Sequence, residues 1–317
     1  MSSVDLSADV AAAATETLTQ LRKAEWQNGF NRADWDVARD AGWLDILRRE
    51  EDGGLGLGLA EMGAVFRAVG RHLFAGPLLE HAVALPLVEQ AGARVEGMVA
   101  IVDRRSRTVR FADCADTLLV LGNGGVSVVP TARATVKPRE SLDPSVTYAD
   151  VSLDGAEPTD RVSLDVERLL GSLRLMIAFE LTGIADRALE LSIAYAKQRE
   201  QFGRPIGSFQ AVQHLLAEMA RRRHVLDALC SSAGAATPEA LPLAGRVTKA
   251  AAAANARKIV EGSMQVHGGI AFTTEHVLHR YYKHLLGLEQ LLGGPRELAT
   301  DLGQMLLRAD ADPWPSW

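Results

Sequence analysis

The segment from Arg199 to Gly203 combines side chains that could bind a phosphate-bearing cofactor. It offers a guanidinium at Arg199, an amide at Gln201 and an aromatic ring at Phe202. A guanidinium can bind phosphate oxygens through two parallel hydrogen bonds, and an aromatic ring can lie beside a planar heterocycle. The segment therefore indicates a site for a pyrophosphate attached to such a heterocycle.

A second segment with similar potential begins at Gln265 and continues to the glycine pair Gly268 and Gly269. Because glycine has no side chain, this pair would let a ligand approach the backbone closely. Each feature alone also has an ordinary interpretation: a single arginine is usually a solvated surface charge, and paired glycines often end a helix. The combination of both segments is what favours a binding site.

The periodicity around these segments predicts the elements that position them. A helix is expected to end near Arg199, followed by a loop through Phe202, Gly203 and Pro205. A new helix is expected from about Ser208, whose hydroxyl is a plausible N-cap. Both segments therefore lie between long helices.

The whole chain divides into three predicted domains of an α+β, mainly α, protein. Residues 1–97 show apolar positions at helical spacing and predict an N-terminal helical domain. Residues 98–162 hold short β-branched runs and predict a small antiparallel β domain. Residues 163–317 return to long amphipathic patterns and predict a helical bundle. The glycine-rich stretch 51–60 lacks GxxxxGK[ST] and is expected to be a turn between helices.

Composition excludes several classes of protein. The chain has 317 residues, 47% of them hydrophobic, so it can bury a sizeable core, and its net charge of −6 argues against nucleic-acid binding. Cys114 and Cys230 belong to no metal-ligand or disulfide pattern. The isolated cysteines therefore give no reason to expect a metal site. No signal peptide or apolar run of about 20 residues is visible, so membrane insertion is not expected. A cytoplasmic protein is the prediction.

Along nearly its whole length the chain resembles the acyl-CoA dehydrogenase family, flavoenzymes that desaturate acyl-CoA thioesters. The stretch 42–80 is similar to a typical N-terminal region of the family, and the two segments described above match its R-x-x-F-G and Q-x-x-G-G motifs. In the family these motifs clasp the adenosine diphosphate half of a neighbouring subunit's FAD. The resemblance thus implies FAD as cofactor, with a fold of N-terminal helices, middle β domain and C-terminal four-helix bundle. It assigns FAD binding to Arg199, Gln201, Phe202, Gln265, Gly268 and Gly269.

The chain departs from the family at the catalytic base, a glutamate that takes the α-proton from one of two places. Overlaying the family patterns puts Leu292 at one place and Leu173 at the other, although Arg174 matches the family's arginine beside the second. Leucine cannot accept a proton. Glu289 and Glu180 remain as displaced bases, but each lies one or two helical turns away. A turn of about 5.4 Å is large for chemistry that tolerates about 1 Å.

The middle segment also departs from the family. The threonine-rich and Trp-Ile-Thr-Asn-like strands that meet the flavin ring are not visible between residues 98 and 162. All five tryptophans lie outside that segment, at Trp26, Trp35, Trp43, Trp314 and Trp317. The resemblance therefore implies a chain that keeps the half-site for a neighbour's flavin and lacks the half that holds its own.

The favoured interpretation is the shorter subunit of an α2β2 acyl-CoA dehydrogenase resembling actinobacterial enzymes for steroid-CoA thioesters. A longer acyl-CoA dehydrogenase-like subunit would supply the glutamate, and an acyl-CoA substrate and an electron-transfer acceptor would be the other partners. One alternative is a self-sufficient homotetramer that uses Glu289 or Glu180 on a short or branched acyl-CoA. Another is a flavin-free scaffold protein with the same fold.

Overall fold

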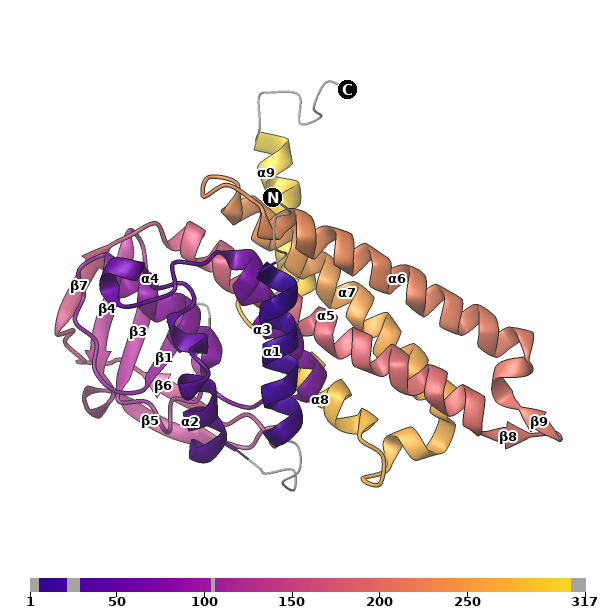
Figure 1. Cartoon of the computed structure of the whole chain (residues 1–317). Helices are drawn as coiled ribbons and strands as arrows, with labels where there is room; N and C mark the ends of the chain where they lie inside the picture. Colours follow the sequence, from indigo (N-terminus) through magenta and orange to yellow (C-terminus); the bar gives the residue numbers. More distant parts are fainter. Residues whose placement is uncertain (1–5, 22–28, 104–105, 309–317) are drawn as a thin grey trace.

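The computed structural model describes residues 6–21, 29–103 and 106–308, and Figure 1 traces the path of the chain. The N-terminal part is helical, as predicted, and its glycine-rich stretch leads from a short 3₁₀ helix into a long helix. Its elements are α1 (Leu6–Leu21), α2 (Arg32–Asp40), η1 (Trp43–Asp45), η2 (Glu50–Asp52), α3 (Leu59–His72), the π-helical turn η3 (Glu80–Ala84) and α4 (Leu85–Gln90).

The middle of the chain forms two small sheets. A four-stranded sheet has the order β1-β3-β4-β7, with β1 (Val99–Asp103), β3 (Thr117–Gly122), β4 (Gly125–Pro130) and β7 (Asp160–Ser163). A three-stranded sheet has the order β2-β6-β5, with β2 (Thr108–Arg110), β6 (Tyr148–Ser152) and β5 (Thr135–Arg139). A short 3₁₀ helix, η4 (Thr131–Arg133), connects β4 to β5.

The prediction of a purely antiparallel sheet is wrong at one pair of strands. β1 and β3 run parallel, with Val99 opposite Thr117, whereas the other pairs in these two sheets are antiparallel. The chain leaves β1 to form β2 in the other sheet and then returns to β3 in the original direction. A crossover through a second element is what a parallel pair requires. Ala100, Val109 and Leu118 are among the residues that form a small core of their own.

The C-terminal part is a bundle of helices. They are α5 (Val166–Gln198), α6 (Gln210–Gly234), α7 (Leu241–His267), α8 (Leu278–Gln290) and α9 (Pro295–Arg308), with the two-stranded hairpin β8 (Glu200–Gln201) and β9 (Arg204–Pro205) and the short helices η5 (Ile206–Ser208) and η6 (Gly268–Phe272). Figure 1 shows the sheets at one end of the molecule and this hairpin at the other.

Helix α5 is the central element, and glycines let its neighbours approach it. A Cβ at Gly171 would lie 2.4 Å from the carbonyl oxygen of Leu241 on α7, so no side chain fits at that contact. A Cβ at Gly183 would lie 1.9 Å from the carbonyl oxygen of Arg67 on α3. One apolar core runs from α3 through β4 to α5 and α8. The three sequence segments therefore share a core, and their division into domains remains a prediction.

The predicted cap at Ser208 is wrong. Helix α6 begins at Gln210 with Phe209 as its N-cap, and no side chain caps it. The Ser208 hydroxyl instead donates to the carbonyl oxygen of Pro205, 2.7 Å away. Ser208 is the last residue of the 3₁₀ turn η5, and its hydroxyl is directed back to the carbonyl oxygen of that turn's N-cap, Pro205, and not to the first amides of α6.

Candidate functional site

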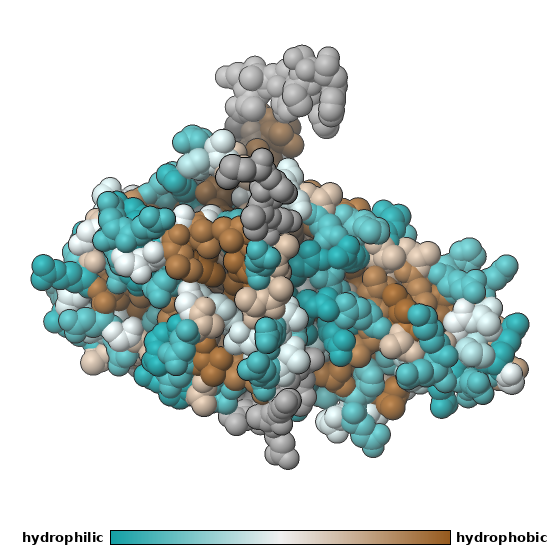
Figure 2. Space-filling view, viewed as in Figure 1, coloured by the Kyte–Doolittle hydropathy of each residue, from teal (hydrophilic) through white to brown (hydrophobic). Residues whose placement is uncertain are grey.

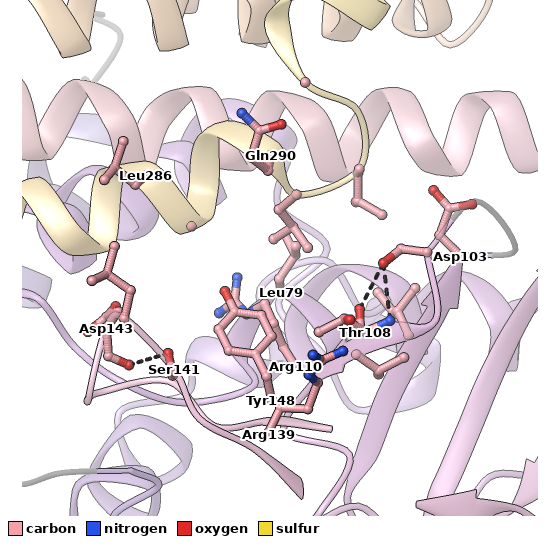
Figure 3. Close-up of a pocket in the computed structure, with 18 of the residues that line it drawn as sticks. Leu79, Asp103, Thr108, Arg110, Arg139, Ser141, Asp143, Tyr148, Leu286 and Gln290 are labelled. Atoms are coloured by element: carbon pink, nitrogen blue, oxygen red, sulfur yellow. Dashed lines mark hydrogen bonds between the residues drawn. The ribbon is translucent and has the colours of Figure 1, made fainter. Parts of the chain in front are cut away.

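A cavity of about 530 Å³ lies between the three-stranded sheet, the turn η3 and the connection from α8 to α9. Its aliphatic lining residues are Leu79, Ile101, Val109, Leu142, Leu286, Leu291 and Leu292. Figure 3 shows Leu286 and Gln290 of α8 on one side of this space and Arg110, Arg139 and Tyr148 of the sheet on the other. A cavity of this size accommodates a drug-sized molecule.

Leu292, at the first position where the family resemblance places a base, lines this cavity and has a positive φ of 57°. Buried cations hold the surrounding loop. The Arg174 Nε atom donates to the carbonyl oxygen of Leu292 at 2.9 Å, and the Lys249 Nζ atom donates to the carbonyl oxygens of Glu289 at 3.1 Å and Gly293 at 2.5 Å. Burial and the nearby Arg174 lower the pKa of Lys249 to about 7. The loop is therefore firmly held around a side chain that cannot accept a proton.

Leu173, at the second place expected for a base, is fully buried in the main core. It is not among the residues that line the cavity. Neither leucine can perform proton abstraction.

The two acids considered as displaced bases are both engaged elsewhere. Glu289 accepts hydrogen bonds from Arg257, at 2.9 Å from Nε and 2.5 Å from Nη2. Glu180 accepts one from the Nε2 atom of His284 at 2.8 Å. Neither acid is among the residues that line the cavity. Their hydrogen bonds therefore disfavour both as bases in this arrangement.

His284 forms the centre of a buried network that joins three parts of the chain. Its Nδ1 atom lies 2.6 Å from Asp143 of the β5–β6 connection, and its Nε2 atom faces Glu180 of α5. Burial alone would lower the pKa of His284, but hydrogen bonds to the two carboxylates raise it to about 9. Burial alone would raise the pKa of Asp143, but hydrogen bonds from His284 and Ser145 bring it down to about 2. The imidazole is thus a buried cation between two carboxylates.

Sequence reasoning missed two charged residues in the cavity, Glu80 and Arg110. Both are buried, with 3% and 8% of their surface exposed. Burial raises the pKa of Glu80, and the guanidinium of Arg110 acts against this rise. The available signal was Arg110 itself, a charge within the apolar run Val109 to Ala112 of a predicted strand.

The predicted cofactor residues lie elsewhere, at the end of the bundle remote from the sheets (Figure 1). Gln201 and Phe202 lie in the β8–β9 hairpin directly after Arg199, which is the C-cap of α5. Phe202 is 92% exposed and has a φ of 54°, and Gly203 follows at 78°. Positive φ at both central residues is what a type I′ turn requires, but it strains a non-glycine residue. An exposed aromatic ring held in a strained turn suggests a functional role.

The second predicted segment lies at the same end of the molecule. Gln265 is exposed on the last turn of α7, and Gly268 ends that helix with a φ of 65°. The rings of Tyr195 on α5 and His267 on α7 stack with centroids 4.4 Å apart, which joins the two helix ends. A Cβ at Gly268 or Gly269 would meet no atom within 4 Å, so packing does not require these glycines.

These six residues fit one side of a dinucleotide such as FAD. They offer a guanidinium, two amides, an exposed ring and an uncovered backbone, which match a pyrophosphate and an adenosine. All six residues are exposed in the chain.

Comparison with known proteins identifies a matching family model and several sequence relatives of the chain. Residues 164–306 match the family model described as "Acyl-CoA dehydrogenase, C-terminal domain". The chain is 30% identical over 302 residues to acyl-CoA dehydrogenase IpdE2 of Mycobacterium tuberculosis, covering 91% of this chain and 89% of that protein. It is 34% identical over 287 residues to IpdE2 of Mycolicibacterium smegmatis, covering 86% of this chain and 88% of that protein.

Solved structures agree with these relatives. The structure titled "Tcur3481-Tcur3483 steroid ACAD G363A variant" has 25% sequence identity and a TM-score of 0.80, covering 95% of this chain and 97% of that chain. The ChsE4-ChsE5 complex from Mycobacterium tuberculosis shares the fold at 21% identity and a TM-score of 0.78, covering 98% and 99%. Among the described helices, none has the length and apolar character that a membrane crossing needs. The sequence relatives and the shared fold together show that this chain belongs to the acyl-CoA dehydrogenase family.

Proposed function

We propose that this chain is the non-catalytic, flavin-clasping subunit of a heteromeric acyl-CoA dehydrogenase that acts on a bulky, steroid-derived acyl-CoA thioester. In this proposal a longer homologous subunit supplies the glutamate base and the contacts to the flavin ring. The similarity to the Tcur3481-Tcur3483 structure, which is described as a steroid ACAD, supports the choice of a steroid-derived substrate.

The separation of the two sites along α5 is the observation that carries this proposal. Arg174 contacts the backbone of Leu292 beside the cavity, whereas Arg199 lies 25 residues later at the other end of the same helix. At 1.5 Å per residue these positions are about 37 Å apart, which exceeds the length of a flavin dinucleotide. A cofactor held at the hairpin would therefore serve a cavity in another subunit.

The chain's own residues would then bind and orient the cofactor. Arg199 would hold the pyrophosphate, Gln201 and Gln265 would donate to its polar groups, and Phe202 would cover one face of the adenosine end. When bound in the partner's site, FAD supplies the acceptor for the hydride that leaves the β-carbon. The leucines at both base positions leave proton abstraction to the partner.

The surface of the C-terminal bundle has exposed apolar areas against which such a partner would pack. Figure 2 shows brown, apolar areas on the visible face of the bundle among hydrophilic ones. Exposed apolar side chains on the bundle helices include Ile193, Val225, Leu243 and Val247. Contiguous exposed apolar patches are typical of interaction sites, so the apolar areas of the bundle in Figure 2 are where this proposal places the contact with the partner.

Purification with and without the longer homologue tests the proposal. We expect bound flavin and dye-linked dehydrogenation of an acyl-CoA only in the co-purified complex. Flavin and turnover in the chain alone would instead support the homotetramer that uses Glu289 or Glu180. Absence of flavin from both preparations would support a flavin-free scaffold.

A further inference from the structure

The cavity beside α8 contains two buried polar atoms whose hydrogen-bonding capacity is unused. Among the residues that the structure describes, Glu80 Oε2 and Arg110 Nε have no hydrogen-bond partner. Both side chains are more than nine-tenths buried, and both line the cavity. Leaving such groups unsatisfied destabilises the protein, and more so when they are charged. A bound ligand that pairs with them would relieve this destabilisation.

Glu80 and Arg110 influence each other without touching. Each affects the pKa of the other through its charge, yet within the described part of the chain they form no ion pair within 4.0 Å. A gap therefore separates the carboxylate from the guanidinium. A small polar group that enters this gap would contact both.

The surrounding structure holds the two groups in place. Glu80 begins the π-helical turn η3, and turns of this kind often occur at functional sites. Arg110 ends β2 opposite Tyr148 of β6, and its guanidinium lies 5.3 Å from the centre of the Phe111 ring. Figure 3 shows Arg110 and Tyr148 together below α8. The pair is thus positioned by packed elements.

The chemistry of the pair defines the polar group that would fit. Arg110 can only donate, so the group must accept a hydrogen bond. An ionised Glu80 can only accept, so the same group must also donate. A hydroxyl does both, and it remains a suitable partner if Glu80 is protonated. An apolar body suits the remainder of the ligand, because leucine, isoleucine and valine side chains from the N-cap of η3, the sheets, α8 and the following loop line part of the cavity.

Charge at the rim argues against a highly anionic ligand. Besides Glu80 and Arg110, the charged lining residues are the acidic Asp103, Glu140, Asp143 and Glu297 and the basic Lys283 and Arg139, of which Arg139 is paired with Asp150 at 2.9 Å. Within the cavity the single charges of Glu80 and Arg110 offset each other. This balance favours a neutral molecule over the phosphate-rich coenzyme A portion of a thioester.

We propose that the cavity binds a neutral polycyclic alcohol, with its hydroxyl between Glu80 and Arg110 and its rings against the leucines of α8 and the following loop. The ligand is bound and not oxidised, because Leu292 stands where a base would act. The choice of a hydroxyl rests on the cavity alone, whereas the choice of a polycyclic body rests on the proposed function.

Direct binding measurements test this inference. Dehydroepiandrosterone and its 3-methyl ether, which can accept but not donate at that oxygen, are titrated calorimetrically into the full chain and into the complex. We expect the ether to bind at least about 10-fold more weakly, as loss of a hydrogen bond to a charged group predicts. Equal affinities, or no binding of the alcohol to the folded protein, would overturn the inference and leave a cavity that holds water.

Variants locate the site. The double substitution Glu80→Met with Arg110→Met removes both charges together, which avoids an isolated buried charge, and should abolish the preference for the alcohol. Leu286→Trp should weaken both probes by filling the cavity. Arg139→Gln at the exposed rim is the matched control and should change neither affinity.

Flavin content and turnover play no part in these measurements, so the result does not depend on the outcome of the co-purification. If the double variant does not fold, two measurements still test the proposed site: the effect of Leu286→Trp, and the affinities of the two probes for the natural sequence. Retained preference for the alcohol in a folded double variant would assign the hydroxyl to other residues and refute the proposed contacts.

Discussion

At the scale of single residues, Phe202 combines backbone strain with little packing, because its exposed ring meets the ring of Phe209 edge-on at a centroid distance of 6.1 Å. A non-glycine residue in the left-handed region costs about 1–2 kcal/mol, and its exposed ring gains little burial in return. The neighbouring Arg199 is likewise exposed. Contact with a ligand therefore explains Phe202 and Arg199 better than a contribution to the stability of the isolated chain does.

We therefore predict that Phe202→Gly leaves the melting temperature of the chain unchanged or higher but lowers flavin retention by the complex. Arg199→Ala should also weaken retention, by about 1.5–3 kcal/mol, because a charge-assisted contact to the pyrophosphate is lost. Flavin absorbance after dilution and thermal denaturation measure the two effects. Arg221→Ala, an exposed arginine on α6 that pairs with Glu218, is the control. Normal flavin content in both motif variants would contradict the assignment.

At the scale of elements, the network of Asp143, His284 and Glu180 joins the sheets, α8 and α5. The protonated imidazole stabilises the fold because its pKa is raised from its ordinary value of 6.5 to about 9 in the folded protein. Its contribution is fully present below about pH 6.5 and is lost as the pH rises through about 9, a loss of roughly 3 kcal/mol. Asp143 behaves in the opposite sense: its contribution is present above pH 3.8 and is lost as the pH falls towards about 2.

The corresponding prediction compares the natural chain with His284→Gln in urea unfolding between pH 6.5 and 9. The variant should be less stable, and the difference between the two proteins should shrink as the pH rises. Lys249, whose pKa is lowered to about 7, adds an opposite pH dependence to both proteins, and it cancels in the comparison. A difference that does not change with pH would show that the imidazole is uncharged in the folded chain.

At the scale of the whole molecule, the proposed flavin-binding residues of the β8–β9 hairpin lie at one end, and the cavity, which has leucine at the family's base position, lies beside the sheets at the other. An α2β2 assembly built in this way would contain two flavins, one for each pair of unequal subunits. The ratio of flavin to protein is therefore set by the assembly of the two kinds of subunit, because neither subunit holds a complete flavin site in this proposal.

We predict that Leu292→Glu in this chain does not raise the flavin content or the turnover of the complex. The substitution restores a carboxylate at the family's base position, but the flavin-ring contacts would still be missing from this cavity. The flavin-to-protein ratio and dye-linked turnover measure the result, with Leu291→Glu as the control for a new charge in the same loop. Additional flavin or turnover in the Leu292 variant alone would refute the proposed division of labour.

Much of this description follows from the sequence by itself. The family, the mainly helical fold and the leucines at Leu173 and Leu292 depend on residue identity and spacing, which the chain carries locally. The same is true of the elements around Arg199, because helix periodicity and an adjacent glycine are short-range signals. The error at Ser208 had a local cause, since one 3₁₀ turn moved the hydroxyl away from the amides of α6.

Only the tertiary structure decided which distant residues share a site. Glu80 and Arg110 are 30 positions apart on a helical turn and a strand, so no sequence period joins them. The engagement of Glu180 and Glu289 likewise depends on His284 and Arg257, which approach from other helices. The parallel pairing of β1 and β3 came from a crossover through another sheet. Such contacts are set by packing across the whole chain, and burial then determines the charge and hydrogen bonding of each group.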